Sequence, residues 1–76
     1  MKLHFFRLSQ YPNFADAKQG QALRTIFLDD VENPTLRTKQ AADIVEAVVL
    51  TVGMMDGGES VQFVLTTDDD VILDTF

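Results

Sequence analysis

The segment from Asn33 to Gly53 constrains the fold most, because its apolar residues recur at the period of a helix. The recurring positions are Ala41, Ile44, Val45, Val48, Val49 and Val52. Asn33 is a favourable N-cap, Pro34 suits the first helical position, and Gly53 stands where helices commonly end. The pattern predicts one long helix with an apolar face. A buried strand is the competing interpretation, because the valine-rich middle has a poor helix propensity.

Two segments after this helix alternate and are rich in β-branched and aromatic residues, which is typical of strands. They are residues 61–66 and 71–76. The run Asp68-Asp69-Asp70 between them predicts a tight hairpin turn, since aspartate tolerates the left-handed backbone conformation better than most other residues. A further turn is predicted at residues 56–58, which contain two glycines.

The first third of the chain allows two interpretations. Residues 2–8 are dense in Phe and Leu and predict a strand. Residues 22–28 then form either a second strand or the end of a helix that begins at Asn13 and tolerates Gly20. We favour the strand because residues 25–28 are β-like and a glycine in mid-helix is unfavourable. The predicted fold is therefore α+β, with the order ββαββ and one long helix packed on one face of a small antiparallel sheet; the helical alternative gives βααββ.

The chain of 76 residues is expected to form a single domain over residues 1–76, and a core of this size barely offsets the cost of ordering the chain. It has no cysteine for a disulfide, and its one histidine excludes the common zinc sites. Association with a second copy is the remaining way to stabilise so small a core, so we expect a homodimer. Apolar residues outside the main helical stripe and on the first strand form its expected interface: Phe5, Phe6, Leu50, Met54 and Met55.

No motif for catalysis, nucleotide binding or metal binding stands out. Three consecutive aspartates in a hairpin diverge and lack the spacing of a calcium loop. His4 stands alone between apolar neighbours, which favours a structural role. We therefore expect no enzyme activity, no cofactor and no metal site. Arg37 and Lys39, in the first turns of the long helix, are expected to pair with acids just upstream, namely Asp29, Asp30 and Glu32.

The charges are distributed asymmetrically. The net charge is −6, all six Lys and Arg lie in the first 39 residues, and residues 40–76 hold eight acids. This argues against direct binding to nucleic acid or anionic lipid. It favours a non-enzymatic interaction protein that binds a basic surface of a protein partner. The most specific form of this hypothesis is an inhibitor whose carboxylates imitate nucleic-acid phosphates on that surface. The expected partner-binding residues are Asp56, Glu59, Asp68, Asp69, Asp70 and Asp74.

Two other functions fit the same sequence. One is an accessory subunit of a larger complex, and the other is a weak nucleic-acid or anion binder that uses Arg24, Arg37 and Lys39. Since no signal-peptide pattern and no stretch of ~20 apolar residues is present, we expect a cytoplasmic protein without a membrane span. Small acidic domains without cysteine are typical of phage and mobile-element genes, which is an analogy of class and not of sequence.

Overall fold

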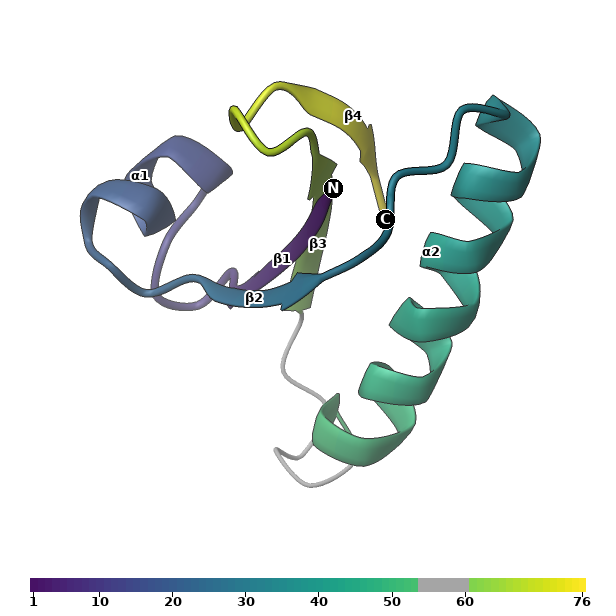
Figure 1. Ribbon diagram of the computed structural model, residues 1–76. Helices are drawn as coiled ribbons and strands as arrows, with labels where there is room; N and C mark the ends of the chain where they lie inside the picture. Colours follow the sequence, from purple (N-terminus) through teal and green to yellow (C-terminus); the bar gives the residue numbers. More distant parts are fainter. Residues whose placement is uncertain (54–60) are drawn as a thin grey trace.

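The computed structural model describes residues 1–53 and 61–76 of the chain. Its elements are β1 (Lys2–Arg7), α1 (Phe14–Gln19), β2 (Arg24–Phe27), α2 (Pro34–Val48), a π-helical turn η1 (Val49–Gly53), β3 (Val61–Thr66) and β4 (Ile72–Thr75). The strands form one antiparallel sheet in the order β2-β1-β3-β4. The long helix α2 lies on one side of this sheet and the short helix α1 on the other (Figure 1). The predicted α+β fold with one long helix on a small antiparallel sheet is confirmed. The turn predicted at residues 56–58 lies outside the described residues.

The long helix begins where the sequence predicts. The Asn33 side chain accepts hydrogen bonds from the backbone N–H groups of Thr35 (2.9 Å) and Leu36 (3.2 Å), and Pro34 occupies the first turn. These bonds satisfy N–H groups that have no partner within the helix. After Val48 the helix continues as the wider turn η1. Val48 of the apolar stripe packs against the core, whereas Val49 and Leu50 of the wider turn are 43% and 60% exposed.

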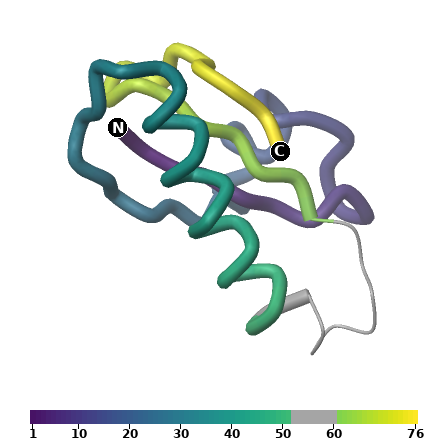
Figure 2. The backbone as a smooth tube through the Cα atoms, turned by 90° about the vertical axis from the view of Figure 1, so that its right-hand side faces the viewer, coloured from purple at the N-terminus to yellow at the C-terminus, as the bar shows by residue number. Residues whose placement is uncertain are grey.

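The main core lies between α2 and the sheet. Leu3, Phe63 and Leu65 point from the two central strands toward Ala41, the fully buried residue of α2. Half-buried side chains of α2, among them Ile44, extend this contact along the helix. Burying a side chain such as Leu or Phe contributes roughly 1.5–3 kcal/mol. Figure 2 shows α2 in front of the sheet, and β2 forms one edge of that sheet.

Residues 13–28 contain a short helix followed by a strand, so each of the two interpretations was half correct. Asn13 caps α1 by accepting a hydrogen bond from Asp16 N–H (2.9 Å), and α1 ends at Gly20. A side chain at Gly20 would collide with the phenol ring of Tyr11. Gly20 is thus the end of a helix and not a defect within one. The observed order is βαβαββ in place of the favoured ββαββ.

The helix α1 covers the opposite face of the sheet with a second, smaller core cluster. Ala17 of α1 is fully buried against Phe6 of β1 and Val64 of β3. Both central strands therefore bury side chains on both faces, whereas β2 and β4 lie at the edges.

The predicted hairpin joins β3 to β4. Asp70 adopts the left-handed conformation (φ 64°), and its N–H donates to the Thr67 carbonyl (3.0 Å). The Thr67 hydroxyl accepts from the N–H groups of Asp69 (3.3 Å) and Val71 (3.1 Å). The turn is thus held by its own side chain and backbone groups. The ladder between β3 and β4 contains a register shift between Leu65 and Thr66.

Candidate functional site

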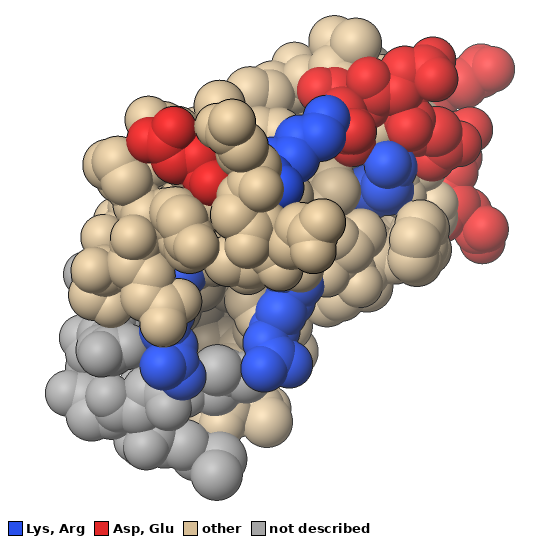
Figure 3. All heavy atoms as spheres, turned by 90° about the vertical axis from the view of Figure 1, so that its left-hand side faces the viewer, with Lys and Arg blue, Asp and Glu red and all other residues tan. Residues whose placement is uncertain are grey.

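One end of the sheet collects acids from two loops. The N-terminal amine bonds to the Leu28 carbonyl (2.9 Å), and Lys2 pairs in register with both Phe27 and Thr66. The loop after β2 and the loop after β3 are therefore neighbours. We call the six acids that these loops carry the acidic end: Asp29, Asp30, Glu32, Asp68, Asp69 and Asp70. Figure 3 shows acidic side chains gathered at one end of the molecule, flanked by basic side chains.

The N-terminal amine joins the two loops of the acidic end. Its nitrogen lies 2.7 Å from Asp30 Oδ1 and 3.3 Å from Asp68 Oδ1. The hydrogen bond to Asp30 raises the pKa of this amine, burial opposes the rise, and Asp68 adds to it. The carboxylates themselves stay open to solvent, with 80% of the Asp30 side chain and 73% of the Asp68 side chain exposed. One buried cation thus fixes two exposed anions side by side.

Asp70 differs from the other acids of this end because it is bound within the chain. Its carboxylate lies 2.7 Å from Lys18 Nζ and 3.0 Å from Lys2 Nζ, and its side chain is only 25% exposed. Hydrogen bonds from Lys18 and then Lys2 lower the pKa of Asp70 to about 2. The residue joins α1, β1 and the β3–β4 turn. Of the aspartates expected to bind a partner, Asp70 therefore has the clearest structural role.

His4 is buried beside this ion-pair cluster and holds three strands together. Its Nε2 lies 2.9 Å from Thr66 Oγ1, and that hydroxyl donates its own proton to the Thr67 carbonyl. Nε2 therefore carries a proton and donates, which leaves Nδ1 to accept from the Thr25 hydroxyl at 2.9 Å. Burial lowers the pKa of His4, and Asp70 opposes this shift from 3.7 Å. A neutral imidazole with both nitrogens bonded fits the structural role that the sequence favours.

The remaining acids expected at the partner surface are not all at the acidic end. Asp74 of β4 lies on the α2 side, where its carboxylate accepts hydrogen bonds from the Thr38 hydroxyl (3.3 Å) and the Thr75 N–H (2.9 Å). Asp56 and Glu59 lie outside the described residues. Conversely, half of the acidic end comes from the loop after β2, whose acids were not among the predicted partner-binding residues.

That loop was expected to pair with the start of α2, and it does not. Asp30 pairs with the N-terminal amine, and no ion pair within residues 1–53 and 61–76 involves Arg37 or Lys39. The Arg37 Nε atom is buried without a hydrogen-bond partner among these residues. Asp30 is thus bound at the end of the sheet and does not pair with either of the two cations predicted as its partners.

The residues expected at a dimer interface lie on different faces. Phe6 is 3% exposed and packs under α1, whereas the neighbouring Phe5 faces α2, with its ring centroid 5.4 Å from that of Phe63. Adjacent residues of a strand point to opposite faces, so these two rings do not share one surface. Leu50 is exposed as expected, and Met54 and Met55 are outside the described part of the chain.

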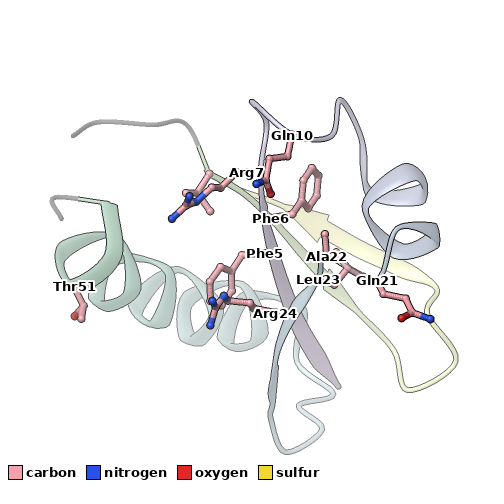
Figure 4. Close-up of a pocket in the computed structure, with 10 residues that line it drawn as sticks. Phe5, Phe6, Arg7, Gln10, Gln21, Ala22, Leu23, Arg24 and Thr51 are labelled. Carbon is pink, nitrogen blue, oxygen red and sulfur yellow. The ribbon is translucent and has the colours of Figure 1, made fainter. Parts of the chain in front are cut away.

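The opposite end of the sheet holds a cavity of about 690 Å³ whose lining includes Phe5, Arg24 and Thr51. Figure 4 shows Phe5 and Phe6 on opposite sides of β1, with Arg24 next to Phe5. Thr51 and Arg37 are fourteen residues apart in the helical segment, or about 20 Å at 1.5 Å per residue. Because Arg24 shares a cavity with Thr51, the three cations proposed for anion binding do not converge.

No protein-family model, curated protein or solved structure matches the chain. Within the described ranges, no three His, Asp or Glu side chains are grouped so that they would hold a metal ion. None of the helices there is long and apolar enough to cross a membrane.

Proposed function

We propose that the protein is a non-enzymatic interaction protein whose acidic end binds a basic surface of a protein partner. The main support for this proposal is that carboxylates outnumber cations at the acidic end. Six acids from two loops meet three cations, namely the N-terminal amine, Lys2 and Lys18, and two of those cations bind the same residue, Asp70. The excess gives this end a field that attracts a cationic surface.

Two of these carboxylates are also held by an ion pair, and the backbone of a third acid is fixed, before any partner arrives. Asp30 and Asp68 are fixed on one buried nitrogen, and Asp69 sits in a turn closed by the Thr67 hydroxyl. A preorganised group loses little conformational entropy on binding, so more of the electrostatic attraction appears as affinity. In the sharpest form of the proposal, the partner's surface is one that otherwise binds nucleic-acid phosphates, and the protein is its inhibitor.

The proposal predicts fast association that weakens with salt. Complementary charges raise association rates, and the Debye length shrinks from roughly 10 Å at 0.1 M salt to 3 Å at 1 M. An accessory subunit held by apolar contacts would show little of this dependence.

The test compares two variants of equal charge. The first removes three carboxylates of the acidic end that form no ion pair among the described residues (Asp29→Asn, Glu32→Gln and Asp69→Asn). The matched control removes three carboxylates from the helices (Asp16→Asn, Asp43→Asn and Glu46→Gln). Each immobilised protein is exposed to cell lysate at low and at high salt.

We expect the wild type and the control to retain the same basic proteins at low salt and to release them at high salt. The acidic-end variant should retain none of these proteins. Equal capture by both variants would refute the proposal. Loss of binding on Arg24→Gln, with the acidic end intact, would favour the anion-binding alternative.

A further inference from the structure

The outer side of β2 has unpaired backbone groups. Met1 and Leu28 exchange both of their backbone hydrogen bonds (2.9 Å each), and such pairs alternate along an antiparallel ladder. The next hydrogen-bonded pairs are therefore Leu3 with Ile26 and Phe5 with Arg24. The N–H and C=O groups of the intervening residues, Thr25 and Phe27, point away from β1. No residue that the structure describes bonds to them.

This edge also exposes an aromatic ring and is regular, although it is only four residues long and begins with Arg24. The Phe27 side chain is 78% exposed, the largest value among the exposed large hydrophobic residues of the described chain. Sheet edges are commonly protected by lysine, proline or a bulge, which discourage pairing with another strand. The β4 side of the sheet has a register shift at Leu65 and Thr66, whereas the ladder of β2 is regular and its four residues include neither lysine nor proline.

We propose that two copies of the chain pair through β2, antiparallel across a two-fold axis at Ile26. In this register Thr25 of each copy stands opposite Phe27 of the other. Their outward N–H and C=O groups then form four hydrogen bonds between the copies. On the α2 side, Ile26 of one copy lies opposite Ile26 of the other. On the α1 side, the two Phe27 residues become diagonal neighbours, roughly 7–8 Å apart at Cα, so that their rings are within reach of each other. The two sheets form one continuous sheet.

The charges of the edge fit a second copy. The same register places Arg24 opposite Leu28 of the second copy, one diagonal step from its Asp30. Arg24 has no ion pair among the described residues, and the Asp30 side chain is 80% exposed. Because the strands run in opposite directions, the acidic end of each copy lies beside the Arg24 end of the other. The two acidic ends are therefore kept apart, and the dimer does not depend on the function proposed above.

The first test is the mass in solution, measured by sedimentation or light scattering over a range of concentrations. We expect about twice 8.5 kDa at micromolar concentration, falling to 8.5 kDa on dilution. Phe27→Lys places a charge on the pairing edge and should leave only the monomer. Leu50→Lys on the exposed turn η1 and Ile72→Lys on the β4 edge are the matched controls, and both should remain dimeric.

The second test needs no substitution and therefore does not depend on the folding of a variant. In the dimer, the amides of Thr25 and Phe27 become hydrogen-bonded, so their hydrogen exchange should slow at high protein concentration and be fast at low concentration. The amide of Ile26, which bonds to β1 in either state, is the internal reference. A mass of 8.5 kDa at every concentration would overturn the proposal. So would a dimer that survives Phe27→Lys and is lost in Leu50→Lys or Ile72→Lys.

Discussion

Asp70 Oδ2 accepts a hydrogen bond from Lys18 Nζ at 2.7 Å, although the two residues are 52 positions apart in the sequence. The other oxygen of the same carboxylate accepts from Lys2 Nζ at 3.0 Å. One acid of the β3–β4 turn thus holds both α1 and β1. This contact distinguishes Asp70 from its two neighbours in the turn, Asp68 and Asp69, whose side chains are exposed.

We expect Asp70→Asn to lower the melting temperature by a few degrees, because two ammonium groups lose their anion. Asparagine tolerates the left-handed backbone at this position, so the backbone conformation does not confound the comparison. Asp69→Asn is the matched control and should change the melting temperature little, since surface substitutions usually have small effects. Thermal unfolding followed by circular dichroism measures both. Equal melting temperatures would show that the ion pairs add no stability.

The same carboxylate predicts a loss of stability in acid. The pKa of Asp70 lies at about 2 in the folded chain against an ordinary value of 3.8, so the unfolded chain binds this proton more readily. The contribution is fully present above pH 3.8 and disappears as the pH falls toward 2. Urea unfolding of the wild type should therefore show a steeper decline across this window than that of Asp70→Asn. Parallel declines would assign the acid sensitivity to other groups.

His4 predicts a second pH effect. Burial lowers its pKa below the ordinary value of 6.5, so the unfolded chain takes up this proton first. The stability that His4 contributes is present above pH 6.5 and falls as the pH drops below that value. An NMR titration of the imidazole should find it still neutral in the folded protein just below pH 6.5. A midpoint at or above 6.5 would contradict this reading of the site.

Removal of the Thr66 hydroxyl should lower the free energy of unfolding by a predictable amount. This hydroxyl is fully buried, and it accepts from His4 Nε2–H. Thr66→Val keeps the shape of the side chain but leaves the imidazole donor without a partner, which costs about 1–3 kcal/mol. Thr25→Val should cost less, because Thr25 lies at the exposed edge and water can replace its hydroxyl. Denaturant unfolding of the two variants decides the order, and the reverse order would argue against the assigned proton position.

The parts of the fold that follow from the sequence are those with local signals. The helix α2 has a cap, a proline at its start and apolar residues at helical spacing, and the hairpin has an aspartate suited to positive φ. The helix α1 has six residues, fewer than two turns, so no periodic pattern can develop in it. The helical interpretation of this segment therefore places Gly20 inside a longer helix, although it ends a short one.

The acidic end illustrates why a site is harder to predict than an element. Its two loops are separated by more than thirty residues, and they meet only because β1 pairs with β2 on one side and β3 on the other. The halves of the chain differ in net charge, and this difference predicts a partner surface made of C-terminal acids alone. The pairing register of the strands, and not the charge pattern of the sequence, brings Asp30 and Asp68 to the same N-terminal nitrogen.

The central position of β1 has a consequence for how the chain folds. Lys2 pairs with Thr66, so the middle of the sheet closes only when residues near the two ends of this sequence meet. Before that, β1 and β2 form a two-stranded ribbon, which is marginally stable alone. Phe63 and Leu65 belong to the main core cluster and Val64 to the smaller one, and all three come from β3. We therefore expect folding in a single cooperative step, slower than that of a helical protein of this size because its contacts are non-local. A chain cut before Val61 would therefore leave both core clusters incomplete.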